Sequence, residues 1–288
     1  MAALEQLVAT VLSRPAPAPV AAMAEHLCAG RNGVAAILAY GSCLRGVSAS
    51  DTLIDFYVLV DRDEDVSPSR LARLGARLVP PNVYYAQHAW DGDILRCKYA
   101  VTTLATFARR MRRDVSNPYF WARFSQPAAL VYAASEESRQ LTIAAVATAI
   151  ETMFTAGLST APACLDALTI WQRGFAETYR TELRPEASGR AGEIVAADAQ
   201  FYRDAARLLE GTSPLSHSWP RVRLMGRLLS LLRLGKAAFT FEGGADYAAW
   251  KIERHTGRKI TVTDWQRRHP FLAGLLMLPA LLRTGALQ

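Results

Sequence analysis

Two dense apolar runs on either side of a Gly-Ser turn constrain this chain more than any other feature. Val34–Tyr40 is followed at once by Gly41 and Ser42, and Leu53–Val60 is the second run. Short apolar runs that stop at turn residues are typical of buried strands. We therefore predict two buried strands, with the Gly41-Ser42 turn at the end of the first.

The pattern after this pair predicts more strands and then helices. Val83–Ala86 and Ile94–Thr103 are rich in β-branched and aromatic residues, and Asp91-Gly92-Asp93 predicts a tight turn between them. From Leu104 onward the pattern is helical, with a long alanine-rich segment at Ser138–Gly157. Other predicted helices are Ala2–Leu12, Val20–Leu27 and Ile194–Leu209.

These patterns predict an α/β protein with two units. The first, residues 1–133, has a mixed sheet of four or more strands, and the second, residues 134–288, is mainly helical, with a winged-helix form as one alternative. With 51% hydrophobic and 20% charged residues, the composition is that of a globular chain and excludes extended disorder.

The charge and the cysteines bear on partners and compartment. A net charge of +7, mostly from arginine, suits contacts with phosphates and anionic lipids. The four cysteines lack CxxC spacing and a nearby histidine, which favours free thiols in a reducing compartment over zinc or disulfides. The N-terminus lacks the pattern of a cleaved signal peptide, and no run reaches about 18 uninterrupted apolar residues. We expect a cytoplasmic protein, peripheral on the inner face of a membrane.

The turn and the second strand together indicate a chemistry. Tyr40-Gly41-Ser42 at the end of one strand, with Asp55 inside the next, is the layout of polymerase-β-like nucleotidyltransferases. A Gly-Ser turn lets backbone N–H groups and a hydroxyl approach a triphosphate, and a strand carboxylate can hold Mg²⁺. Tyr40, Gly41 and Ser42 are therefore predicted to bind nucleotide. The alternative is an ordinary turn, because Gly-Ser often follows a strand.

The source of a second metal ligand stays open. Enzymes of this layout usually carry two acidic residues two positions apart, and Leu53 stands where the other one would be. Asp51 shares the face of Asp55, but four residues of strand separate the two by about 13 Å. We predict Asp55 as the metal ligand, with Asp51 as a second candidate. Asp61 and Glu186 are further alternatives.

A longer set of residues resembles the mitochondrial-type phosphatidate cytidylyltransferase family. The resemblance runs through Ala39–Ser42, through Leu53–Asp61 with its single Asp followed by Phe, and through Leu95–Thr103, where Lys98-Tyr99 resembles the end of a strand in the family. It continues at low identity over nearly the whole chain. The later segments that carry it are Val83–Tyr85, Phe120–Pro127, Tyr179-Arg180, Phe201–Arg203 and Lys236–Thr240.

This resemblance implies transfer of CMP from CTP to phosphatidic acid, with Mg²⁺ as cofactor and release of pyrophosphate. The attacking phosphate is already ionised, so the protein must mainly bring two polyanions together and cancel their charge. Lys98 and Lys236 are the predicted catalytic cations, and Arg180 is predicted to bind nucleotide. Each has a structural alternative: a sheet-edge lysine for Lys98, a helix end for Lys236, and a solvated ion pair for Arg180.

The C-terminal segment Pro270–Leu287 is apolar and follows the basic run Gln266–His269. This combination suits a segment that lies among lipid headgroups, which would place the protein on an anionic membrane surface. The alternative is a helix packed on the core or on a partner chain.

Two rival functions remain from the sequence. One is a nucleotidyltransferase with a soluble or RNA acceptor, although we do not expect nucleic acid as a partner. The other is a catalytically inactive nucleotide- or lipid-binding module, which the absence of an acid at Leu53 allows. Metal-dependent turnover separates that module from either enzyme.

Overall fold

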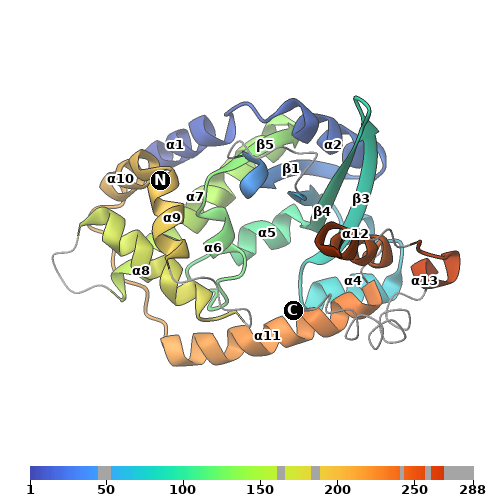
Figure 1. The fold of residues 1–288 in the computed structure, drawn as a ribbon. Helices are drawn as coiled ribbons and strands as arrows, with labels where there is room; N and C mark the ends of the chain where they lie inside the picture. The colour runs from blue at the N-terminus through green and yellow to red at the C-terminus, as the bar shows by residue number, and fades with distance from the viewer. Residues whose placement is uncertain (45–52, 161–165, 183–188, 241–242, 257–260, 269–288) are drawn as a thin grey trace.

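The computed structural model describes residues 1–44, 53–160, 166–182, 189–240, 243–256 and 261–268 (Figure 1). Its centre is a mixed five-stranded sheet in the order β3-β4-β2-β1-β5. The strands are β1 (Val34–Tyr40), β2 (Ile54–Val60), β3 (Asn82–Trp90), β4 (Asp93–Thr103) and β5 (Ala128–Ala133). Only the β2–β4 pair is parallel among these neighbours. The α/β class and the mixed sheet are thus confirmed.

Local sequence explains the strands that were predicted. β1 and β2 are buried along almost their whole length, as dense apolar runs require. The hairpin between β3 and β4 turns at Asp91 and Gly92, whose φ angles of 50° and 82° lie in the left-handed region that Asp-Gly pairs tolerate. β5 was not predicted. Its alanines give little strand signal, and it exists through its antiparallel pairing with β1.

Helices cover both faces of the sheet. One face packs against α1 (Ala2–Leu12), α5 (Leu104–Arg110), α6 (Trp121–Phe124) and α7 (Glu136–Leu158). The other face packs against α2 (Ala18–Ala29), α3 (Asp63–Val66) and α4 (Arg70–Leu78). Because side chains alternate along a strand, Tyr57 faces the first layer and Phe56 the second.

The remaining helices belong to the C-terminal half. They are α8 (Ala167–Tyr179), α9 (Arg190–Ala197), α10 (Ala199–Leu208), α11 (Trp219–Thr240), α12 (Gly244–Thr256) and α13 (Asp264–Arg268). The predicted helix Ile194–Leu209 is interrupted at Asp198, whose φ of −145° and ψ of 55° are not helical. α11 crosses the lower side of the molecule in Figure 1, from the α8 side to α4.

One hydrophobic cluster joins the two halves of the chain. It includes Leu38 and Tyr57 from the sheet and Ile150, Trp171 and Tyr202 from the helices that follow residue 133. The helix α7 is long and apolar enough to span a membrane by length and composition, but 72% of its most apolar window is buried inside the protein. Packing in this cluster accounts for its apolar character.

Candidate functional site

A row of side chains crosses the sheet at one level. Tyr40 of β1 pairs in register with Asp55 of β2, Asp55 pairs with Lys98 of β4, and Lys98 pairs with Tyr85 of β3. Residues in register on neighbouring strands point to the same face. The sheet therefore brings the predicted residues Tyr40, Asp55 and Lys98 together, although they are far apart in the sequence.

The Asp55 carboxylate is the centre of this row. Its Oδ1 atom lies 3.6 Å from Nζ of Lys98, and the two side chains are 28% and 39% exposed. Oδ1 is buried, and it accepts no hydrogen bond from the described residues. Lys98 is on an interior strand, so the sheet-edge alternative for this lysine is wrong. A buried carboxylate oxygen without a donor is a position where a cation can bind.

Gly41 places bare backbone beside this carboxylate. Its φ of +91° is strained for any residue with a side chain, and an added Cβ would lie 3.6 Å from Asp55 Oδ2. Ser42 begins the short 3-10 turn Ser42–Leu44 directly after it. The predicted Gly-Ser turn and the predicted metal ligand are thus neighbours in space.

Three arginines that the sequence did not single out belong to a group that begins at this row, where only Arg123 contacts it directly. Arg123 of α6 donates a hydrogen bond from Nη1 to Tyr40 Oη at 3.3 Å, and its guanidinium lies 4.9 Å from the ring centre of Tyr119. Arg233 of α11 lies 3.8 Å from the centre of the same ring. Arg110 of α5 also interacts with Arg233 through its charge. We call Lys98, Arg110, Arg123 and Arg233 the cation cluster.

Two members of the cation cluster, Arg110 and Arg233, are electrostatically strained. Burial lowers the pKa of both Arg110 and Arg233. Burial would raise the pKa of Tyr119, but Arg123, Arg233 and Lys98 lower it below its usual value. The buried Nε of Arg110 donates no hydrogen bond within the described part of the chain. Buried cations that lack full compensation are expected where a polyanion binds.

The residues present fit a magnesium ion only in combination with a ligand. No group of three or more His, Cys, Asp or Glu among the described residues could hold a metal by itself. Mg²⁺ is commonly held by one or two carboxylates together with substrate phosphates. Asp55 supplies one such carboxylate. Leu53, two positions before Asp55, is half-buried. Asp51 and Glu186 lie outside the described residues.

Two predicted cations lie elsewhere in the structure. Lys236 donates hydrogen bonds of 2.5 Å to the carbonyl oxygens of Val79 and Pro81, and burial lowers its pKa to about 8. These carbonyls directly precede β3, and Arg233 donates a hydrogen bond to the carbonyl oxygen of the intervening Pro80 at 3.4 Å. Arg180 is exposed at the end of α8 and forms an ion pair with Glu177. This is the kind of interaction that the sequence offered as the structural alternative for Arg180. The structure does not bring either residue to Asp55.

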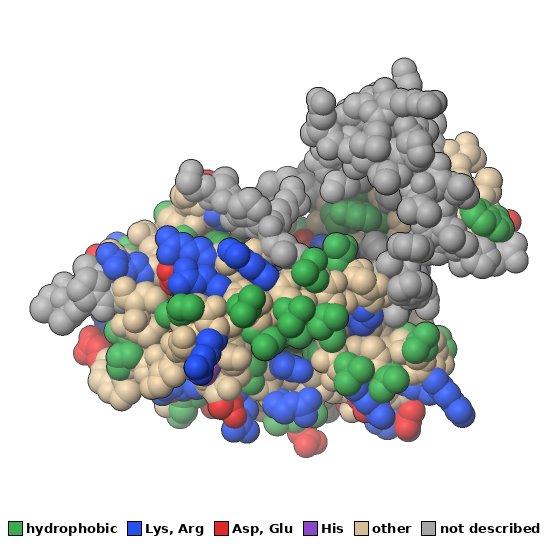
Figure 2. All heavy atoms as spheres, turned by 90° about the horizontal axis from the view of Figure 1, so that it is seen from below, with side chains coloured by type: hydrophobic (Ala, Val, Ile, Leu, Met, Phe, Trp, Pro, Cys, Tyr) green, Lys and Arg blue, Asp and Glu red, His purple; other side chains and the backbone are tan. Residues whose placement is uncertain are grey.

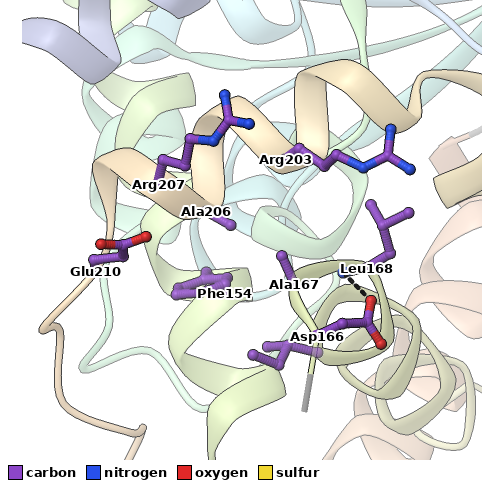
Figure 3. Close-up of a pocket in the computed structure, with 9 residues that line it drawn as sticks. Phe154, Asp166, Ala167, Leu168, Arg203, Ala206, Arg207 and Glu210 are labelled. Atoms are coloured by element: carbon purple, nitrogen blue, oxygen red, sulfur yellow. Dashed lines mark hydrogen bonds between the residues drawn. The ribbon is translucent and has the colours of Figure 1, made fainter. Parts of the chain in front are cut away.

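Of two pockets, the first lies near this row and the second lies far from it. One of 460 Å³ borders the Gly41 turn and is lined by Leu44, Gln126 and Arg14 among others. Another of 460 Å³ lies between α7, α8 and α10, where Arg203 and Arg207 project from one side of α10 above Phe154 (Figure 3). In that second pocket the Asp166 carboxylate caps its own helix, accepting from Leu168 N at 3.0 Å (Figure 3). It contains none of the predicted site residues.

The candidate site is therefore the face of the sheet around Asp55, below the cation cluster and beside the Gly41 turn. Cys28, Cys43 and Cys97 form no disulfide among the described residues, and Cys164 lies outside them. The predicted membrane-facing segment Pro270–Leu287 also lies outside them. Neither a protein-family model nor a curated protein matches this chain.

Proposed function

We propose that this protein is a nucleotidyltransferase that transfers CMP from CTP to phosphatidic acid. The observation that carries the proposal is the buried Oδ1 of Asp55, which lacks a donor, between the Gly41 turn and the cation cluster. One carboxylate beside open backbone and several cations is the set of groups that a magnesium-bound triphosphate requires. The sequence resemblance supports CTP and a lipid phosphate as the two substrates.

In the proposed reaction the residues act mainly by position and charge. The triphosphate lies along the backbone at Gly41 and Ser42, and Lys98 and Arg123 bind its oxygens. Asp55 would hold Mg²⁺, which when bound neutralises phosphate charge. An oxygen of the phosphatidic acid phosphate attacks the α-phosphorus of CTP. The new P–O bond forms as the bond to the β-phosphate oxygen breaks, and pyrophosphate leaves with its electron pair.

No general base is needed for this reaction, because the attacking phosphate is already an anion at neutral pH. The free-energy barrier instead comes mainly from the repulsion between the acceptor phosphate and the triphosphate. The cation cluster would offset that repulsion: its members come from β4, α5, α6 and α11, and Arg123 and Arg233 both lie over the Tyr119 ring. Of these cations, Lys98 lies beside Asp55, and Arg123 interacts through its charge with Glu182.

The test is release of pyrophosphate from CTP with magnesium, with and without vesicles that contain phosphatidic acid. We expect turnover that requires both the metal and the lipid and that prefers CTP over ATP, GTP and UTP. Thin-layer chromatography of radiolabelled lipid would identify CDP-diacylglycerol as the product. Turnover that ignores the lipid would contradict the proposed acceptor and favour a soluble one. A lack of turnover with every nucleotide would favour a binding module.

The variant Lys98→Met tests the cation cluster. We expect kcat/KM for CTP to fall by about 10²-fold, because one preorganised cation beside the phosphates is lost. Its melting temperature should change little, since a half-exposed ion pair contributes at most about 1 kcal/mol. Steady-state kinetics at several CTP concentrations would measure the effect. Arg207→Met, which removes an exposed arginine from α10, is the control and should leave kcat/KM unchanged.

The variant Lys236→Met separates the two predicted catalytic lysines. Because its ammonium group binds the carbonyls of Val79 and Pro81, we expect a loss of stability of about 1–3 kcal/mol from unsatisfied carbonyls. We expect kcat/KM to change far less than in Lys98→Met. Thermal unfolding and steady-state kinetics on the same preparations would distinguish a structural role of Lys236 from a catalytic one. An intact melting temperature with a hundredfold loss of turnover would instead place Lys236 in the catalytic machinery.

A further inference from the structure

The outward side of α11 is apolar. Leu224 is 72% exposed and Leu231 is 54% exposed, whereas Val222 and Gly226 on the inward side are buried. The other exposed apolar residues of this helix are Met225, Leu228, Leu232 and Leu234. A surface helix of a globular protein normally shows the opposite pattern, with its apolar stripe toward the core. The outward side of α11 therefore lacks an apolar partner among the described residues.

The helix α4 extends this apolar surface. Leu71, Leu74 and Leu78 are 72%, 52% and 68% exposed and recur at helical spacing, while Ala72 and Ala76 are buried. The two helices touch beside this stripe, because a Cβ added at Gly75 would lie 3.1 Å from the side chain of Lys236. We call the exposed leucines of α4 and the exposed apolar residues of α11 the leucine face. Figure 2 shows hydrophobic side chains gathered on this side of the molecule, with basic side chains among and around them.

The charge of these two helices restricts what can cover the leucine face. α4 contains three arginines, α11 contains four arginines and one lysine, and neither helix contains Asp or Glu. Some of these charges are engaged locally, as in the pair of Arg77 with Asp63 at 2.8 Å. The surroundings of the leucine face are nevertheless basic. A second copy of the chain would bring like charges together in a two-fold interface, whereas an anionic surface would attract them.

We propose that the leucine face docks on an anionic phospholipid bilayer. Exposed leucines would enter the boundary between headgroups and acyl chains, and the arginines at their edges would meet lipid phosphates. The inference deepens the proposed function and rests on it for the choice of a lipid partner. α11 links the two sites directly: its outward side carries the leucines, and Arg233 on its inward side reaches the cation cluster. A bilayer on the leucine face would thus lie one helix thickness, roughly 10 Å, from the candidate site.

Vesicle flotation of the full chain tests the docking surface without any catalysis. The probe is a vesicle of phosphatidylcholine with a minor fraction of phosphatidylglycerol, without CTP or phosphatidic acid. We expect the wild type to float with these vesicles, and Leu228→Glu/Leu231→Glu and Leu71→Glu/Leu74→Glu to partition at least about tenfold less. Pure phosphatidylcholine and high salt should both weaken wild-type binding, because part of the attraction is electrostatic.

Matched controls use exposed leucines away from the leucine face. Leu141→Glu in α7 and Leu208→Glu in α10 replace leucines of 48% and 45% exposure, and we expect both to float like the wild type. Circular dichroism of each variant would check that it is folded. Flotation of the leucine-face variants at the wild-type level would overturn the proposal. Light scattering would measure the oligomeric state. A dimeric wild type together with monomeric leucine-face variants would also overturn the proposal and assign the face to a second copy of the chain.

Turnover distinguishes this inference from the proposed function. With a short-chain, water-soluble phosphatidic acid as acceptor, the leucine-face variants should keep wild-type kcat/KM, because the Asp55 row is intact. With phosphatidic acid in vesicles, they should lose turnover in proportion to their lost binding. Wild-type protein that floats but never turns over CTP would support the docking surface and contradict the enzyme.

Discussion

Asn in place of Asp55 should lower turnover of CTP by about 10³-fold or more, because the change removes the carboxylate charge that, in the proposed reaction, would hold the magnesium-bound triphosphate. The amide keeps the shape of the side chain, so the Gly41 turn and the Tyr40 pairing should persist. The loss should appear mainly in kcat and persist at saturating CTP. Pyrophosphate release under saturating substrate and metal measures it.

The stability of Asp55→Asn should change by less than about 1 kcal/mol, since two small effects oppose each other. The variant loses the attraction to Lys98 Nζ at 3.6 Å, and it no longer buries an Oδ1 charge that lacks a donor. Asp61→Asn is the matched control, because Asp61 directly follows the same strand at the opposite end and is exposed. It should retain activity. Equal losses in both variants, or full activity of Asp55→Asn, would contradict the assignment of Asp55.

Ala in place of Trp171 should lower the free energy of unfolding by about 3–5 kcal/mol. The indole is fully buried, lies 5.1 Å from the Phe154 ring centre and 5.2 Å from that of Tyr202, and donates a hydrogen bond to the Tyr202 carbonyl oxygen at 2.9 Å. Its removal leaves a cavity and an unsatisfied carbonyl. Urea unfolding followed by circular dichroism measures the change.

The control for this prediction is Trp265→Ala in α13, where the side chain is 45% exposed and should contribute little. Because one hydrophobic cluster includes both Tyr57 of the sheet and Trp171, we also expect the loss to affect a single transition. A separate, earlier transition of the helical half in the variant would indicate that residues after 133 unfold independently. A loss below about 1 kcal/mol would contradict the packing argument.

Much of the sheet was predictable because its signals are local. The apolar runs of β1 and β2 and the Asp-Gly turn of the β3–β4 hairpin each lie within a few neighbouring residues. Backbone geometry and desolvation act at that range, so the pattern alone predicts the element. β5 and α4 were missed for the opposite reason. β5 depends on pairing with β1, and the leucines of α4 are exposed and do not mark a core.

The sequence by itself determined the α/β class, the strands that carry Tyr40, Asp55 and Lys98, and the turn at Gly41, because each follows from short-range patterns of burial and backbone freedom. Only the tertiary structure decided which cations meet Asp55. The parallel register of β2 and β4 places Lys98 beside it, and α6 and α11 bring Arg123 and Arg233 to the Tyr119 ring, with Arg123 also bonded to Tyr40. It also left Lys236 and Arg180 with other partners. Charge clusters depend on contacts between distant segments, and no local pattern encodes those contacts.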